Sequence, residues 1–156
     1  YHPRPMPDDL PESLQAAPIP PRSFKKSDPG LIAGFAVDAA RLLFDDKCEE
    51  VTLLDVRSKS MVCDYIIIGS GTSDRQMASA LEHVKQLGHG RGFTAFHVST
   101  DDGSTWLLAD FVDVVIHLFE PNIRAHYDLE TLWGDAPRVE WERPDQRRRD
   151  RAGLGG

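Results

Sequence analysis

The stretch Gly69-Ser70-Gly71-Thr72-Ser73 combines two glycines with three hydroxyl side chains, directly after the apolar run Ile66-Ile67-Ile68. Glycines allow a sharp turn of the backbone, and the amide groups of such a loop can bind a phosphate where a helix begins. Ser73 and Gln76 form a capping-box pattern, which starts a helix. The local pattern is typical of a phosphate-binding loop, and equally of a plain junction between a strand and a helix.

A strand that ends in Gly-Ser before a helix is similar to the nucleotidyltransferase signature, in which two metal ions bridge the phosphates. That chemistry needs a pair of carboxylates near the loop to hold the metal ions. The corresponding stretch, Ser79-Ala80-Leu81-Glu82-His83, offers a single carboxylate, and no Walker lysine follows the glycines. We therefore predict that the chain is not an enzyme, with a nucleotide-binding transferase that uses the Gly-Ser loop as the alternative function.

His97, His117 and His126, with Asp110 or Asp113, are the residues from which a zinc site could be built. Their spacing matches no zinc motif, and a lone histidine on a strand is more often a hydrogen-bonded core residue than a ligand. We therefore predict no metal and no cofactor.

The two cysteines, Cys48 and Cys63, form neither a Cys-x-x-Cys pair nor a ligand spacing with histidine. Such cysteines are typical of reduced thiols in a cytosolic protein, and no histidine base can be assigned to Cys63. No apolar run approaches the ~20 residues that span a bilayer, and the proline-rich beginning resembles neither a signal peptide nor a transit peptide. We expect a cytoplasmic protein without a cysteine nucleophile.

Apolar periodicity surrounds the Gly-Ser loop with helices and strands. The predicted elements are a helix over 29–46 that Asp28 caps, strands over 51–56 and 65–68, a helix from 73 to the glycines at 88–92, strands over 93–99, 105–109 and 113–119, and a helix from Pro121 to Trp133. Asp101-Asp102-Gly103 is predicted to be a hairpin turn. The sequence therefore predicts an α/β fold: a mixed five-stranded sheet with flanking helices in α-β-β-α-β-β-β-α order.

Composition divides the chain into three segments. At 156 residues it can bury one core, which we place in a domain over 28–142. Residues 1–27 hold seven prolines and few periodic apolar positions, so we predict a flexible arm. Residues 143–156 are predicted to be a disordered tail, whose Arg147-Arg148-Arg149 could contact RNA phosphates or simply be solvated.

The net charge is uneven along the chain. The whole chain carries −7, residues 1–30 are neutral and residues 143–156 carry +3, which leaves −10 on residues 31–142. A body of that charge repels nucleic acid, and it either attracts a basic protein partner or only keeps the surface soluble.

Trp106 is followed by two aspartates, Asp110 and Asp113, on either side of Phe111-Val112. One interpretation is a hairpin with aspartates at its turn and a tryptophan in the core. The other is a sheet surface that presents an aromatic anchor beside acidic residues, an arrangement that suits a basic protein partner. The residues by themselves leave both interpretations open.

The motifs, taken in order, resemble the ribosomal silencing factor family, also called Iojap-related. They are Leu54-Asp55-Val56, Lys59-Ser60, Asp64-Tyr65, Gly71-Thr72-Ser73, Arg75-Gln76, His83-Val84, Trp106, Asp110, Asp113-Val114-Val115, Ile116-His117, Arg124, Tyr127, Leu129-Glu130 and Leu132-Trp133. No single motif is specific, but their common order is, and they cover about 31–135.

The resemblance implies a translation repressor with a nucleotidyltransferase-like fold that lacks the catalytic carboxylates. Members of the family bind the large ribosomal subunit through ribosomal protein fourteen and block joining of the small subunit when nutrients are short. Several members are homodimers when free, so the resemblance also implies a homodimer. A basic partner of this kind agrees with the charge of −10 on residues 31–142.

Within the resemblance, four residues are predicted to bind the partner. Trp106 and Leu108 would be apolar anchors, and Asp110 and Asp113 would supply polar and charged contacts. The chain departs from the family before Arg124, where members often carry a glutamate that is absent here, so a contact through that acid is not expected.

The resemblance changes the interpretation of the opening loop. Gly71, Thr72, Ser73 and Arg75 are then best interpreted as a structural joint that fixes the central strand against the helix that follows. The arm and the tail lie outside the match, and no role carries over to them.

Overall fold

The computed structural model describes residues 28–95, 97–100 and 105–146, with the backbone alone at 97–100, 126 and 127. The predicted arm, the hairpin turn at 101–103 and the arginines at 147–149 lie outside these residues. The division into arm, domain and tail stays a prediction, and the described chain continues through Gln146.

Helix α2 (Pro29–Asp45) begins at the residue that the sequence predicts. The Asp28 carboxylate accepts a hydrogen bond from the Gly30 amide (2.7 Å), and Pro29 occupies the first turn, where its missing amide costs nothing. The buried face of the helix consists of Ile32, Phe35, Ala36, Ala39, Ala40 and Leu43. Leu31 is apolar but lies outside this face, and 64% of its surface is exposed.

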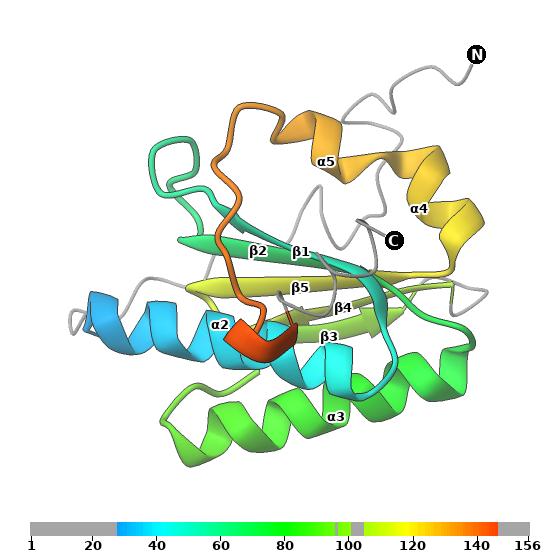
Figure 1. The fold of residues 1–156 in the computed structure, drawn as a ribbon, viewed down its shortest axis with the longest axis horizontal. Helices are drawn as coiled ribbons and strands as arrows, with labels where there is room; N and C mark the ends of the chain where they lie inside the picture. Colours follow the sequence, from blue (N-terminus) through cyan, green and yellow to red (C-terminus); the bar gives the residue numbers. More distant parts are fainter. Residues whose placement is uncertain (1–27, 96, 101–104, 147–156) are drawn as a thin grey trace.

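Strands β1 (Glu49–Asp55), β2 (Tyr65–Ser70), β5 (Val114–Phe119) and β4 (Trp106–Asp110) lie side by side in that order, and the short β3 (His97–Thr100) pairs with the outer side of β4. The pair β2–β5 is parallel and the other pairs are antiparallel. Helices α2 and α3 (Asp74–Gly90) cover one face, and α4 (Pro121–Tyr127) and α5 (Leu129–Leu132) cover the other (Figure 1). The predicted mixed α/β sheet with flanking helices is confirmed.

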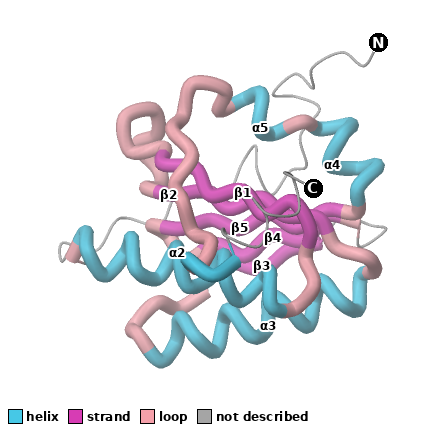
Figure 2. The backbone as a smooth tube through the Cα atoms, viewed as in Figure 1, coloured by secondary structure: helices cyan, strands magenta, loops and turns pink. Residues whose placement is uncertain are grey.

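Each face of the sheet has its own apolar core. The core beneath α2 and α3 contains Phe35, Leu53, Ile67, Leu81 and Ile116 among others. The core on the α4–α5 side is smaller and contains the alternate residues of the same strands: Leu54, Ile66, Ile68, Trp106 and Phe119. Figure 2 shows the strands as a central layer between these two helical layers.

The expected strand over 93–99 is wrong in its first half. Helix α3 ends in a Schellman-type turn, in which Gly92 has φ 84° and the Phe93 amide donates to Gly88 O (2.7 Å). The Phe93 ring then turns inward and stacks on Phe35, with ring centroids 4.6 Å apart. Phe93 therefore closes the helix, and β3 starts only at His97.

The single helix expected from Pro121 to Trp133 is also wrong, because it is broken at Asp128. Asp128 has a left-handed backbone (φ 45°), which ends α4 and starts α5. The Thr131 hydroxyl donates to the Asp128 carboxylate across the break. Asp tolerates this conformation better than most residues, so a helical pattern of apolar positions hides the break.

The Gly-Ser loop is shorter than expected because β2 continues through Gly69 and Ser70, which pair with Leu118 and Phe119. Neither Gly69 nor Gly71 has a positive φ, so freedom to turn does not explain them. A Cβ added to Gly71 would lie 2.1 Å from Met77 Cγ. Gly71 is needed because α3 packs against it.

Candidate functional site

Strand β4 places three of the four predicted partner-binding residues on one face of the sheet. Leu107 and Ala109 belong to the core beneath α2 and α3, so the alternate positions Trp106, Leu108 and Asp110 point to the α4–α5 side. Asp113 lies just beyond, in the turn before β5. The structure therefore brings the four residues to neighbouring positions along one strand and its turn.

Trp106 is part of an aromatic group with two residues of β5. Its ring lies 4.5 Å from that of Phe119 and 5.9 Å from that of His117, measured between centroids. Its indole Nε1 donates to His117 Nδ1 (3.2 Å). Because Nδ1 accepts, the imidazole proton of His117 is assigned to Nε2.

Burial lowers the pKa of His117 from 6.5 to about 3, so the ring is neutral at physiological pH. From the sequence, His117 was weighed as a zinc ligand against a hydrogen-bonded core residue, and the second interpretation is confirmed. In the structure it is the hydrogen-bond partner of Trp106. No group of three potential ligands occurs among the residues described, and the side chains of His97 and His126 are outside that description.

The four predicted partner-binding residues differ in solvent exposure. Trp106 and Leu108 expose 3% and 5% of their surface, whereas Asp110 and Asp113 are half-buried. In this conformation a partner can therefore reach the two aspartates, and it can reach the two apolar side chains only if the chain around them rearranges. The assignment of the four residues to partner binding stays a prediction.

The two aspartates also shape the turn between β4 and β5. Asp110 Oδ1 accepts from the Val112 amide (2.7 Å), and Val112 has φ 74°. The Asp113 carbonyl accepts from the amides of Asp64 and Tyr65 (2.8 and 3.1 Å), which joins the turn to the start of β2. These bonds hold the two residues in a fixed position, as the hairpin interpretation expects for Asp110.

The joint between β2 and α3 has the bonds of a helix cap. Ser73 Oγ accepts from the Gln76 amide (3.1 Å). Gln76 Oε1 accepts from the Thr72 amide (3.0 Å), one residue before the amide that a standard capping box uses. Gln76 Nε2 donates to Asp46 O (2.8 Å), so the same side chain ties α3 to the end of α2. Thr72 and Arg75 are exposed.

Arg124 is a buried charged residue to which the sequence assigned no contact. Its Nη1 donates to Ser70 Oγ at the end of β2 (2.9 Å), and its Nε donates to Glu130 Oε1 on α5 (2.7 Å). The acid that pairs with Arg124 is thus Glu130, beyond the helix break, and not a residue before the arginine. Arg124 and Glu130 both belong to the family motifs, but only the fold shows that their side chains pair.

The two cysteines lie in the interior of the domain. Cys48 and Cys63 expose 3% and 4% of their surface. Burial raises the pKa of the Cys48 thiol to about 11, which keeps it protonated and unreactive. Its sulfur lies 3.6 Å from Gln76 Nε2.

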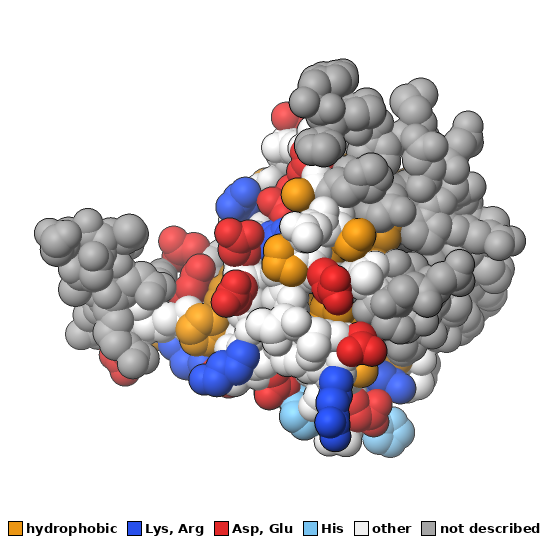
Figure 3. Space-filling view, turned by 90° about the vertical axis from the view of Figure 1, so that its right-hand side faces the viewer, with side chains coloured by type: hydrophobic (Ala, Val, Ile, Leu, Met, Phe, Trp, Pro, Cys, Tyr) orange, Lys and Arg blue, Asp and Glu red, His pale blue; other side chains and the backbone are white. Residues whose placement is uncertain are grey.

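The described surface carries both acidic and basic side chains. Figure 3 shows acidic and basic side chains interspersed over the described part of one end of the molecule. On α2, Asp38 pairs with Arg91 (2.7 Å) and Asp45 with Arg143 (2.8 Å). Among the helices described, none is long and apolar enough to cross a membrane.

A family model described as "Ribosomal silencing factor during starvation" matches residues 33–153. The chain belongs to this family. Its members are ribosome-binding factors that repress translation without catalysis, and the family implies binding to the large ribosomal subunit. The chain is therefore not an enzyme.

Individual relatives agree with the family model. The chain is 35% identical over 104 residues to the ribosomal silencing factor RsfS of Halalkalibacterium halodurans, which covers 67% of this chain and 89% of that protein. It is 28% identical over 121 residues to the chloroplastic protein Iojap of Zea mays, covering 78% of this chain and 53% of that one. A crystal structure of a Chromobacterium violaceum protein superposes with a TM-score of 0.61 at 28% identity, covering 69% of this chain and 88% of that one.

Proposed function

We propose that this ribosomal silencing factor binds the large subunit through ribosomal protein fourteen and so prevents the small subunit from joining. The family match over residues 33–153 carries the proposal, because it establishes the class of protein and its ribosomal target. The mechanism is occlusion. A standard interface covers ~800 Å² on each partner, which is enough to hold a domain of this size where the subunits would meet.

We propose that the contact surface is the end of the sheet formed by β4 and the turn before β5. The Asp110 carboxylate accepts from the Val112 amide, and the Asp113 backbone is fixed through its carbonyl, so both acidic residues are held at this turn, where a basic partner could meet them. Trp106 and Leu108 lie on the same strand and would become anchors when the surrounding chain rearranges on binding.

The first experiment tests the function. Purified small and large subunits are mixed with and without the protein and separated on a sucrose gradient. We expect the protein to sediment with the large subunit and the 70S peak to decrease. A 70S peak that is unchanged at saturating protein contradicts the silencing mechanism.

The second experiment tests the surface. In the double variant Asp110→Asn and Asp113→Asn, the asparagine oxygen at position 110 can still accept from the Val112 amide, so the turn is kept while two charges are removed. We expect binding to ribosomal protein fourteen to weaken about 3- to 10-fold, with a smaller salt dependence. Asp135→Asn is the matched control, because its side chain is 93% exposed and lies outside the proposed surface.

Equal binding by the double variant and the control would remove the two aspartates from the interface and leave the function itself untouched. Trp106→Ala is then the test of the anchor, with an expected loss of about 2 kcal/mol or more in binding. Because Trp106 is buried, circular dichroism must first show that this variant is folded.

We also propose that the free protein is a homodimer, that it acts in the cytoplasm, and that the fold is nucleotidyltransferase-like without the catalytic carboxylates. A contact of the arginine-rich tail with ribosomal RNA is proposed on its charge alone. The nucleotide-binding transferase is not proposed again, because the family is non-catalytic and the side chain of Met77 fills the space beside Gly71.

A further inference from the structure

The loop over 57–63, which joins β1 to β2, presents two adjacent apolar side chains to solvent. Met61 exposes 94% of its surface and Val62 exposes 45%. Figure 1 shows this loop projecting beyond one end of the sheet. Single exposed apolar residues are ordinary on a protein surface, whereas neighbouring ones mark a place of contact. We call these two residues the Met61–Val62 tip.

The loop holds its tip in one position through its own hydrogen bonds. The amides of Lys59 and Ser60 donate to Val56 O (3.0 and 2.8 Å). The Ser60 hydroxyl oxygen accepts from the amides of Val62 (3.0 Å) and Cys63 (3.3 Å). Cys63 is buried in the core on the α4–α5 side, which fixes the returning end of the loop. The tip is therefore ordered before any partner arrives, so binding costs little conformational entropy here.

The base of the loop is bonded to the acidic turn before β5. Asp64 follows the loop directly, and its amide donates to Asp113 O (2.8 Å). Val62 precedes Asp64 by two residues, so their Cα atoms lie at most ~7 Å apart. The tip and the turn that contains Asp110 and Asp113 therefore form one continuous surface at this end of the sheet.

Within this surface the apolar side chains differ in what a partner can reach. Trp106 and Leu108 on β4 expose only 3% and 5% of their surface. The Met61–Val62 tip is already exposed in the same conformation. A partner can therefore make its first apolar contact with the tip, without any rearrangement of the chain.

The basic residues of the loop are already paired with carboxylates of the same chain. Arg57 makes two hydrogen bonds to Asp55 (3.0 and 2.7 Å) and lies over the ring of Tyr65, 5.5 Å from its centroid. Lys59 Nζ lies 3.5 Å from the carboxylate of Asp135. Residues 55–64 contain two basic and two acidic side chains, and residues 110–113 add two aspartates, which leaves a net charge of −2. Such a surface attracts basic groups and repels phosphates.

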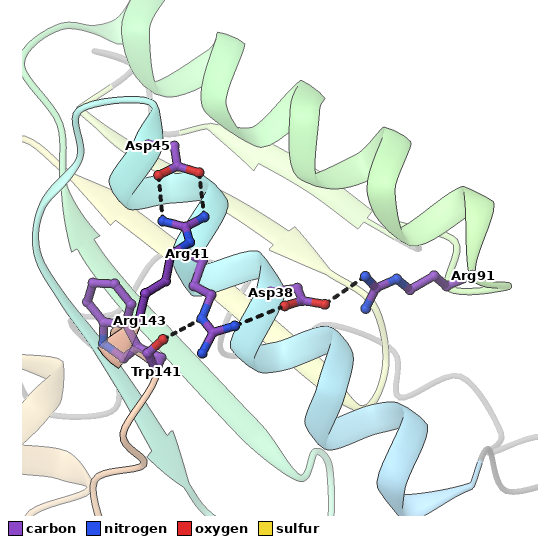
Figure 4. Close-up of polar contacts among 6 residues, drawn as sticks. All are labelled: Asp38, Arg41, Asp45, Arg91, Trp141 and Arg143. Atoms are coloured by element: carbon purple, nitrogen blue, oxygen red, sulfur yellow. Dashed lines mark hydrogen bonds and ion pairs between the residues drawn. The ribbon is translucent and has the colours of Figure 1, made fainter. Parts of the chain in front are cut away.

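The arginines over α2 are paired in the same way (Figure 4). Arg91 and Arg41 lie 2.7 and 3.8 Å from the carboxylate of Asp38. Arg143 makes two hydrogen bonds to Asp45 (2.9 and 2.8 Å). These side chains do not form a phosphate-binding patch, because each already meets a carboxylate. A protein, and not RNA, is the partner that these charges favour.

We propose that the Met61–Val62 tip is the exposed apolar contact of the partner-binding surface and enters a hydrophobic hollow that lysine or arginine side chains surround on a basic protein. Methionine suits such a hollow because its unbranched side chain adapts to an irregular shape. An apolar centre with acidic residues beside it matches the usual anatomy of an interface. The proposal rests on the proposed function, in which the basic protein is ribosomal protein fourteen.

Met61→Ser in the full chain tests the tip. We expect the Kd for purified ribosomal protein fourteen, measured by calorimetry, to rise about 10-fold or more. Met61→Leu keeps the apolar volume and should bind within about twofold of the unaltered chain. Leu31→Ser is the matched control, because Leu31 is 64% exposed but lies on α2, and it should leave the Kd unchanged. The urea midpoint should be the same for all three variants, since each side chain is exposed.

Ser60→Ala tests whether the shape of the loop positions the tip. The substitution removes the acceptor of the Val62 and Cys63 amides. We expect it to raise the Kd about threefold in the unaltered chain and to have no effect in the Met61→Ser chain, because a misplaced tip matters only while the methionine is present. A purely structural role of Ser60 would raise the Kd equally in both.

Hydrogen peroxide provides a chemical version of the same test. The sulfur of Met61 takes one oxygen atom from peroxide and water leaves, so the apolar tip becomes a polar sulfoxide. Met77 is fully buried and therefore protected, and Met6→Leu removes the third methionine of the chain. After peroxide is removed, we expect the Met6→Leu chain to bind about 10-fold more weakly and to recover with methionine sulfoxide reductases. Adding Met61→Leu should make binding insensitive to peroxide.

Subunit mixing separates failure of the tip from failure of the function. An unaltered chain that does not lower the 70S peak overturns the function and the proposal with it. If the unaltered chain lowers the peak and Met61→Ser lowers it equally at the same concentration, only the tip is overturned. The tip is also overturned if Met61→Ser changes the oligomeric state in light scattering, or weakens binding to protein-free ribosomal RNA, and leaves the Kd for the protein unchanged.

Discussion

The two faces of the sheet are built from the same strands but covered in different ways. On one face, two helices of 17 residues each lie over an almost wholly aliphatic and aromatic core. On the other face, helices of 7 and 4 residues lie over a smaller core. Of the four buried polar side chains in the described chain, His117, Arg124 and Ser70 belong to this second face, and the fourth is Gln146 near the end of the described residues.

The first face therefore contributes mainly to stability, and the second face mainly fixes the positions of particular side chains. The first face is filled by side chains that only need to be apolar and of the right size, and its interactions are not directional. The second face depends on a few hydrogen bonds that fix Trp106, α4 and α5 in one arrangement, and an unpaired buried group there would be costly. The residues that we propose for partner binding lie on this second face.

The largest effect is expected on the first face. Phe35 is fully buried and contacts Phe93 and Phe111, with ring centroids 4.6 and 5.1 Å away. Phe35→Ala should lower the free energy of unfolding, measured by urea titration, by about 3–5 kcal/mol. Leu31→Ala on the same helix is the control and should change it by less than about 0.5 kcal/mol, because that side chain is 64% exposed. Equal losses would mean that α2 does not pack as described.

A smaller loss is expected on the second face from Arg124→Gln. The substitution leaves Ser70 and Glu130 without their charged donor in a site where the arginine side chain is 9% exposed. We expect the free energy of unfolding to fall by about 2 kcal/mol. Adding Glu130→Gln should recover part of this loss. If the single variant is as stable as Arg91→Gln at the exposed Asp38 pair, the buried network contributes nothing beyond a surface ion pair.

An effect that is absent near pH 7 and develops only in acid is a pH dependence that belongs to the second face. The pKa of His117 is about 3 in the folded chain and 6.5 for the free side chain, so between these values the unfolded state binds more protons than the folded state. Stability is therefore complete above pH 6.5 and decreases as the pH falls, by at most ~1.4 kcal/mol per pH unit from this group. His117→Asn should flatten the slope measured between pH 4.5 and 6.5 and leave it unchanged between pH 7 and 8. An equal slope in both proteins between pH 4.5 and 6.5 rules out His117 as the cause.

The sequence predicts the first face better because its signals are local. Asp28 and Pro29 mark the start of α2, and Ser73 and Gln76 mark the start of α3 within a few residues of each other. The alternation along β4 likewise places Trp106 and Leu108 on one side. Their burial does not follow from alternation, because it depends on what packs over the strand.

The contacts that the sequence could not predict join distant residues. Arg124 meets Ser70 across 54 positions, and Trp141 meets Val51 across 90. Residues 135–146 have neither an apolar period nor a strand-like run, so the sequence pattern does not predict their pairing with β1. The break at Asp128 was missed for a different reason, because a left-handed aspartate leaves the apolar spacing of the helix intact.

The bond from Arg41 to Trp141 spans 100 positions and so sets an order of events during synthesis. Residues 137–139 pair with the outer edge of β1. Chains emerge at about 5–20 residues per second, so β1 is present several seconds before these residues. Until residues 137–139 have left the exit tunnel, α2, β1 and β2 can fold only with this edge of β1 unpaired. This ribosomal silencing factor is thus most prone to mispairing with neighbouring nascent chains on a polysome, while it is still attached to a ribosome.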